Sequence, residues 1–174
     1  IELTGSGHTL ISQTFVAPII GVGTNLNGLN VRPGRTIALI GGQTTLNGGV
    51  INAPSGHIEI AGVNEGLVAL SPTTTGFQFN YQASQGFQNV TLTNRALTDA
   101  TGFGLGSIGI QGQNIKIDRG SVVVAQNAGN RPNGDFLINA AESLTISGTD
   151  AIARLPSGIV GHARYGGPVG LEQA

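Results

Sequence analysis

The fold is decided by residues 33–63, which read PGRTIALIGGQTTLNGGVINAPSGHIEIAGV. In this stretch, pairs of mostly apolar residues separated by one position start every seven residues, at Ile37, Thr44, Ile51 and Ile58. Three such steps make a repeat of 21 residues. A shift of 21 gives these matches: Pro33 with Pro54, Ile37 with Ile58, Leu39 with Ile60 and Gly41 with Gly62.

The same ladder, meaning the series of apolar pairs that start every seven residues, returns later in the chain. A shift of 71 residues places Ile37 on Ile108, Leu46 on Ile117 and Ile51 on Val122. Looser copies follow at shifts of 28, which places Ile108 on Phe136, and 29, which places Ile115 on Leu144. The chain is therefore predicted to repeat one structural unit several times.

A seven-residue spacing also fits a coiled coil, but here the apolar residues alternate and glycine interrupts them, which costs a helix about 1 kcal/mol at each position. The pattern instead predicts an all-β, three-faced β-solenoid, in which short parallel strands stack coil upon coil. Asn47, Asn52 and Asn114 are expected at corners, either with positive φ or as amide ladders. Positive φ is also expected at these corner glycines: Gly41, Gly42, Gly48, Gly49, Gly62, Gly112 and Gly120.

Composition excludes several classes of protein. Glycine supplies 29 of the 174 residues, charged residues are only 10 %, and the net charge is −1 without a basic cluster. A nucleic-acid partner is therefore not predicted. The absence of cysteine excludes a disulfide framework and a zinc ribbon. Because residue 1 is isoleucine, we expect a processed or excised piece of a longer protein.

One domain of coils is expected over residues 1–152, with weaker strands near Ile1–Leu3, Leu10–Ile11 and Val16–Ile20. The ladder is interrupted at residues 71–89, which we interpret as an excursion from the tube. Residues 153–174 are rich in glycine and proline and are interpreted as a last coil or a flexible linker.

Three runs resemble a known family: Gly28–Val63, Gly106–Gln126 and Gly134–Asp150 are similar to coils of filamentous-haemagglutinin-like exoproteins of the two-partner secretion system, particularly cyanobacterial ones. The resemblance covers roughly residues 1–152. It implies a right-handed parallel β-helix, export through an outer-membrane TpsB-type β-barrel transporter, and display or release as an adhesin or surface fibre. The family's Asn-Pro-Asn-Gly motif is not matched, because Asn25–Gly28 reads NLNG and Pro132 follows Arg131. The family offers no catalytic residue to transfer.

Four of the eight Phe and Tyr residues lie close together in the excursion, at Phe77, Phe79, Tyr81 and Phe87. Alternating rings on a protruding hairpin can form a stacking platform for a glycan or a protein partner. The alternative, which we favour, is an extra strand that lays these rings against the flank of the tube.

Two further groups of residues bear on chemistry. Asp118, Asp135 and Glu142, with Lys116 and Arg119, resemble the acid and base set of a β-helical carbohydrate-active enzyme, whereas solvated corner charges are the alternative that we favour. His57 and Glu59 face outward on one strand as half of a metal site, but no third ligand is evident on the neighbouring coil. No metal, cofactor or catalytic residue is predicted.

The sequence thus predicts a non-enzymatic segment of a secreted, surface-displayed exoprotein that acts in adhesion or as an extracellular fibre. The alternatives are a self-polymerising filament subunit, by end-to-end or lateral packing, and a carbohydrate-active enzyme. Expected partners are the TpsB-type transporter during export and surface glycans or proteins.

Overall fold

The computed structural model describes residues 1–8, 28–74, 76–104, 106–129, 131–132, 134–151 and 154–163. Their regular elements are strands, and the described ranges contain no helix long and apolar enough to cross a membrane. The strands expected at Leu10–Ile11 and Val16–Ile20 lie outside these residues.

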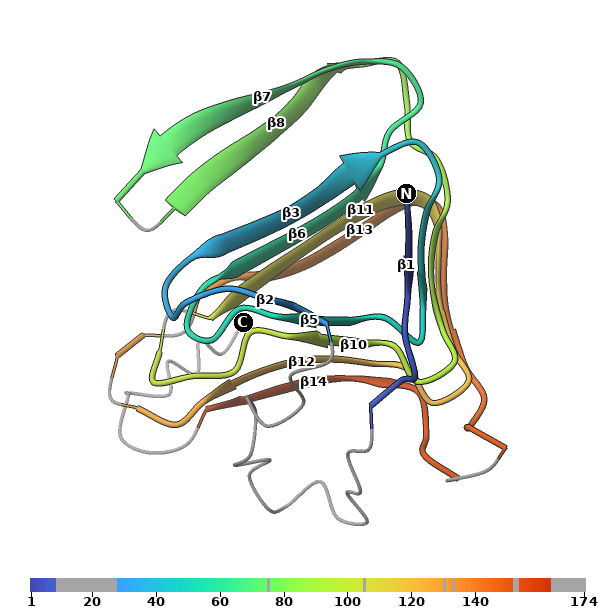
Figure 1. The fold of residues 1–174 in the computed structure, drawn as a ribbon. Helices are drawn as coiled ribbons and strands as arrows, with labels where there is room; N and C mark the ends of the chain where they lie inside the picture. The colour runs from blue at the N-terminus through green and yellow to red at the C-terminus, as the bar shows by residue number, and fades with distance from the viewer. Residues whose placement is uncertain are drawn as a thin grey trace, which may run out of the picture.

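The strands form a tube with three faces, which Figure 1 shows end-on as a triangle. The first face contains β3 (Thr36–Gly41), β6 (His57–Gly62) and the first halves of β11 (Ser107–Asp118) and β13 (Phe136–Ser147). The second face contains β1 (Glu2–Thr4), β4 (Thr44–Asn47), β9 (Val90–Thr93) and the second halves of β11 and β13. The third face contains β2 (Leu29–Asn30), β5 (Val50–Asn52), β10 (Leu97–Asp99), β12 (Val122–Asn127) and β14 (Gly158–Ala163).

All neighbouring strands within these faces are parallel and lie one coil apart, so the chain is a parallel β-helix, as predicted. The predicted alignments hold on two faces: Ile37 pairs with Ile58, Ile58 with Ile108 and Ile108 with Phe136. Leu46 reaches Ile117 through Leu92.

The alignment of Ile51 with Val122 is wrong by one residue. Ile51 pairs with Thr98, and Thr98 pairs with Val123. The corner that leads into β12 contains one residue more than the corner between β4 and β5, so a constant shift fails there. Because successive side chains of a strand point to opposite faces, this slip decides that Val123 enters the core and not Val122.

The core consists of aliphatic side chains stacked on one another in successive coils. The largest fully buried ones are Leu46, Ile51, Ile58, Ile60, Leu92, Ile108, Ile110, Ile115 and Ile117. Stacking of β-branched side chains one coil apart fills a narrow tube without large rings, which explains the low aromatic content.

The corners use glycine in two ways. Gly48 and Gly120 have φ of 66° and 76°, as predicted, whereas the other five corner glycines have no positive φ. Gly62 serves another purpose, because a Cβ there would lie 2.4 Å from the backbone oxygen of Gln88. Amide ladders are confirmed at Asn47, which accepts from Asn94 Nδ2 at 2.5 Å, and at Asn114, which donates to Asn89 Oδ1 at 3.1 Å.

The excursion is an antiparallel hairpin of β7 (Gly66–Thr73) and β8 (Gly76–Ser84), inserted between β6 and β9. It begins at Gly66 and not at residue 71, because residues 66–70 pair with β8 and leave the tube. In Figure 1 the hairpin lies outside the tube, over the first face. The chain rejoins the coil where Phe87 bridges to Val63.

The segment expected as a last coil or a linker begins with irregular backbone and continues as β14, which pairs with β12 on the third face. Residues 152–153 and 164–174 lie outside the described ranges.

Candidate functional site

The outer surface of the first face carries two rows of side chains that the hairpin covers. Because the strands are parallel and in register, outward positions of successive coils stand beside each other. One row contains Thr36, His57 and Ser107, and the next contains Ala38, Glu59, Gly109 and Leu137.

Glu59 is the centre of this surface, and only 5 % of it is exposed. Its Oε1 accepts a hydrogen bond of 2.6 Å from the Tyr81 hydroxyl on β8. Its Oε2 lies 3.1 Å from His57 Nε2. Burial, together with the Glu59 carboxylate, raises the pKa of the Tyr81 hydroxyl, so this group remains protonated and donates. The carboxylate is thus the point at which the hairpin is tied to the tube.

His57 connects the carboxylate to the next coil. A carboxylate only accepts hydrogen bonds, so Nε2 carries the proton and, in the neutral imidazole, Nδ1 accepts from Ser107 Oγ at 2.7 Å. The ring also stacks on Phe79 of β8, with centroids 5.7 Å apart and an interplanar angle of 23°. The imidazole therefore contacts the hairpin and two coils of the tube.

Gly109 makes room for this arrangement. A Cβ at Gly109 would lie only 2.0 Å from Glu59 Oε2, so the carboxylate rests against the bare backbone of β11. The sequence contains a signal for this contact, since Gly109 separates Ile108 from Ile110 at the position opposite Glu59. Recognising it requires the shift of 50 residues that the hairpin creates between β6 and β11.

Ser107, His57 and Glu59 follow the order hydroxyl, imidazole, carboxylate that serine hydrolases use. Acyl transfer also requires donors for the developing oxyanion. The N–H groups of Ser107 and Ile108 already donate to Gly56 O (2.9 Å) and Asp135 O (3.0 Å) in the strand ladder. The backbone beside the serine thus offers no oxyanion hole, and the trio acts as a polar tether.

A cleft of about 450 Å³ opens beside the tether, between β8 and the first face. Besides the tether residues, it is lined by Thr73, Phe77, Gln78, Gln111, Asp135 and Leu137. The ionisable residues among the described ones that line it are His57, Glu59, Tyr81 and Asp135, and none of them is a lysine or arginine. The cleft is therefore acidic and partly apolar.

The four aromatic residues singled out from the sequence divide into two groups. Phe79 and Tyr81 face the tube, and Phe87 packs against Tyr81 with centroids 5.7 Å apart. These three rings lie against the flank. Phe77 shares the inner face of the hairpin with Phe79 and Tyr81 but remains 46 % exposed at the wall of the cleft.

The carboxylates proposed for an enzyme are dispersed. Asp118 lies on the second face, 2.8 Å from Lys116 Nζ. Although burial opposes it, the hydrogen bond from Lys116 holds the pKa of Asp118 below its ordinary value. Glu142 accepts from Gln113 and Asn114 at the bend between the first and second faces. Asp135 alone reaches the cleft.

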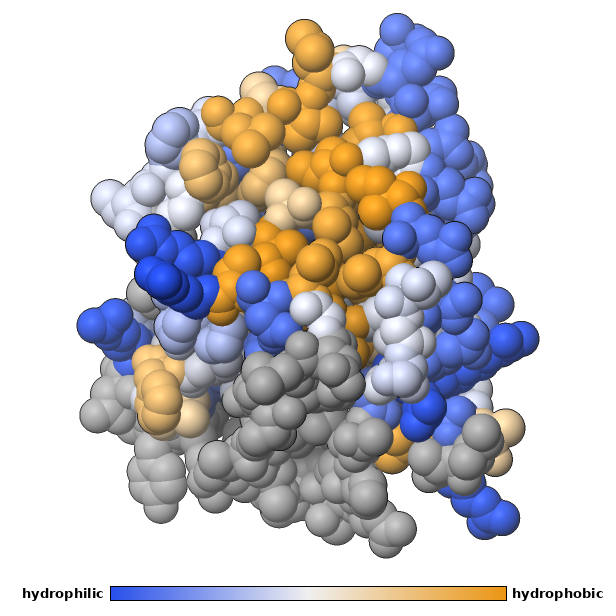
Figure 2. Space-filling view, viewed as in Figure 1, coloured by the Kyte–Doolittle hydropathy of each residue, from blue (hydrophilic) through white to orange (hydrophobic). Residues whose placement is uncertain are grey.

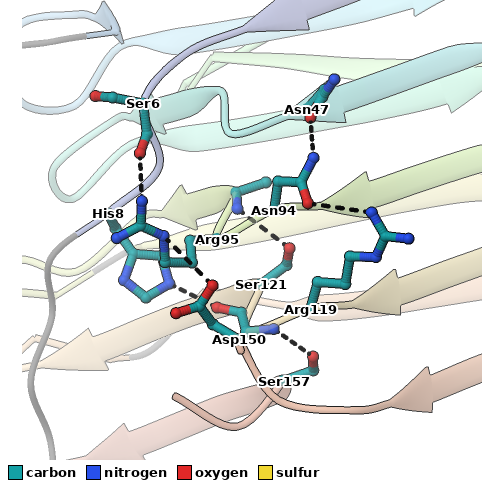
Figure 3. Close-up of polar contacts among 11 residues, drawn as sticks. Ser6, His8, Asn47, Asn94, Arg95, Arg119, Ser121, Asp150 and Ser157 are labelled. Carbon is teal, nitrogen blue, oxygen red and sulfur yellow. Dashed lines mark hydrogen bonds and ion pairs between the residues drawn. The ribbon is translucent and has the colours of Figure 1, made fainter. Parts of the chain in front are cut away.

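A second polar cluster, shown in Figure 3, runs along the corner between the second and third faces. Buried His8 contacts Gly120 O at 2.8 Å, and Arg95 donates to Ser6 O at 2.9 Å and lies 3.9 Å from Asp150. Burial lowers the pKa of His8, so the ring is neutral near pH 7. These contacts tie successive coils together. Within the described ranges no three His, Cys, Asp or Glu side chains are grouped to hold a metal ion.

Comparison with known proteins agrees with the fold and the resemblance. The family model of the TPS secretion domain matches residues 4–117, which is more than half of the 174-residue chain. No curated protein and no solved structure matches the chain. The parallel β-helix and the family match together show that this chain belongs to the TPS secretion domain family, whose members are exoproteins exported by two-partner secretion.

Proposed function

We propose that this secreted exoprotein acts as a non-enzymatic adhesin and contacts its target through the inner face of the β7–β8 hairpin. Family membership establishes export by two-partner secretion with a TpsB transporter, and the family is not a catalytic one. Attachment at a cell surface is the additional step that we propose.

The observation that carries the proposal is the half-open inner face of the hairpin. The strand register places Leu70 opposite Phe79 and Pro72 opposite Phe77, so these side chains share the face that carries Tyr81. Phe79 and Tyr81 are covered by the tube, whereas Leu70 remains 52 % exposed and Phe77 nearly as much. Figure 2 shows apolar side chains gathered over the hairpin and the end of the tube below it. Exposed apolar patches of this kind mark interaction sites.

The test compares cell binding by the labelled, secreted protein with that of a Leu70→Ser/Phe77→Ser double variant. Loss of two central apolar contacts is expected to reduce binding at least about tenfold. Gln82→Ala, a change at an exposed residue of β8 that does not line the cleft, is the matched control and is expected to bind as the wild type does. Equal binding by the double variant and the wild type would refute adhesion through this face.

One observation favours a filament as the second candidate. β13 pairs with β11 on one edge only within the described chain, and Leu144 and Ile146, at core positions, are more than 40 % exposed. A second copy stacked on this edge would continue the tube. Sedimentation velocity over a hundredfold range of concentration tests this candidate, because a monomer throughout would exclude it.

A further inference from the structure

The cleft under the hairpin has the side-chain chemistry of a small-ligand site. Its volume of about 450 Å³ falls within the range of about 300–1,000 Å³ that small-molecule sites occupy. We infer that it binds a neutral saccharide unit, with the ring of Phe77 against the apolar face of the sugar and Gln111 and Asp135 on its hydroxyl groups. This inference rests on the proposed adhesive function and names the ligand class of the same surface.

The first argument is that the cleft contains a side-chain amide with no hydrogen-bond partner among the described residues. Gln111 lies on β11 with only 8 % of its surface exposed, and it lines the cleft. Its side chain makes no hydrogen bond to the described part of the chain. The amide nitrogen and oxygen of Gln111 therefore reach the solvent of the cleft, where they can bind a ligand. A ligand with both hydroxyl donors and hydroxyl acceptors satisfies such a group.

The second argument is that one of the three aromatic rings on β8 is not engaged by the tube. Phe79 is occupied by its stack on His57, and Tyr81 by its hydrogen bond to Glu59. Phe77 has neither contact and stands at the wall of the cleft, with Leu137 also lining it. An aromatic face beside polar groups suits a sugar, which presents C–H groups on one face and hydroxyls around its edge.

The third argument is charge. Asp135 accepts hydrogen bonds only, and no lysine or arginine of the described part of the chain lines the cleft. An anionic sugar or a phosphate would meet two carboxylates without a balancing cation. The floor is the face of a sheet whose backbone groups are paired on both sides of β11. Recognition therefore depends on side chains that suit hydroxyl groups, which favours a neutral saccharide over an extended peptide.

The experiment begins with the purified chain on an array of neutral, acidic and amino saccharides. The strongest neutral ligand is then titrated calorimetrically against wild type, Phe77→Ala and Gln111→Ala. Each variant is expected to weaken binding at least about tenfold. Gln82→Ala is the matched amide control and should bind as wild type does. Phe77→Leu keeps the apolar volume but removes the flat ring, so it should also bind more weakly while the melting temperature stays at the wild-type value.

Several results would overturn the inference. One is that no neutral saccharide binds with a Kd below about 1 mM, and another is that both cleft variants keep wild-type affinity. A third is that only cationic sugars bind and that about 0.5 M salt abolishes their binding. At that ionic strength, exposed charges are screened within a few ångströms, so such binding would be electrostatic. If saccharides fail to bind while cells still bind through Leu70 and Phe77, the ligand class is wrong and adhesion stands. If saccharides bind but cells do not, the site is real and the adhesive role fails.

Discussion

A Leu46→Ala variant is expected to lose about 2–5 kcal/mol of its free energy of unfolding, which is a large part of the stability of a single domain. Leu46 is fully buried in the second face, where Leu3 of one neighbouring coil and Leu92 of the other flank it. Truncation removes buried methyl groups and leaves a cavity in the middle of the ladder. Because each coil of a solenoid contacts only its neighbours, the damage falls on both adjoining interfaces. Urea unfolding followed by circular dichroism measures the change.

Leu67→Ala is the matched control, because it makes the same chemical change on the hairpin, where the leucine is 75 % exposed. It is expected to change the free energy of unfolding by less than about 0.5 kcal/mol. Similar losses in both variants would contradict the assignment of Leu46 to a packed core and of Leu67 to the surface.

The tube was predictable from the sequence because its determinant is periodic. In-register stacking requires the same residue class at each corresponding position, so Ile37, Ile58 and Ile108 show the register as well as the fold. The prediction failed at Val122, where the corner before β12 adds one residue, because a fixed shift cannot detect a change in corner length. The prediction of a positive φ was also wrong at Gly62. Glycine is required there because a side chain would collide with the backbone of Gln88, and not because of the backbone conformation.

The candidate site was predictable only in part. The aromatic alternation marked the hairpin strand, and the outward positions of His57 and Glu59 followed from Ile58 facing inward. The pairing of Tyr81 with Glu59 was not predictable, since an inserted hairpin can fold over any coil and nothing periodic fixes its direction. Gln111 was missed for the same reason: its burial depends on what covers the sheet.

The second large effect is expected at a buried carboxyl group on the third face. Asp99 in β10 pairs with Asn52 in β5, and both side chains are buried. Thr101 N–H donates to Asp99 Oδ1 at 2.7 Å, but Asp99 Oδ2 and Asn52 Oδ1 have no hydrogen-bond partner among the residues that the structure describes. Burial raises the pKa of Asp99 from 3.8 to about 6, against the opposing hydrogen bonds from Thr101.

The sign of the pH dependence follows from this raised pKa. The folded state favours the protonated carboxyl, so its contribution to stability is fully present below about pH 4 and is lost as pH rises through about 6. A shift of about two units corresponds to about 3 kcal/mol. An Asp99→Asn variant carries no charge at this position, and its amide can donate to Asn52 Oδ1. It is therefore expected to exceed the wild type in stability by up to about 3 kcal/mol at pH 8 and by little at pH 4.

Urea unfolding of both proteins at pH 4, 6 and 8 measures this difference. His8 titrates in an overlapping range with the opposite sign, because burial lowers its pKa and its contribution falls as pH drops below about 6.5. Both proteins retain His8, so its effect cancels in the difference between them.

Asp118→Asn supplies the control of opposite sign. Its carboxylate is held charged by Lys116, so neutralising it is expected to lower stability at pH 8 and still at pH 4, because the contribution of a lowered pKa is lost only as the pH falls below the ordinary value of 3.8. If Asp99→Asn also lowered stability at pH 8, the Asp99 carboxylate would have to be charged and satisfied in the folded state. An Asn52 side chain turned to present its amide N–H groups to Asp99 would explain that result, and the pair would then stabilise the third face at neutral pH.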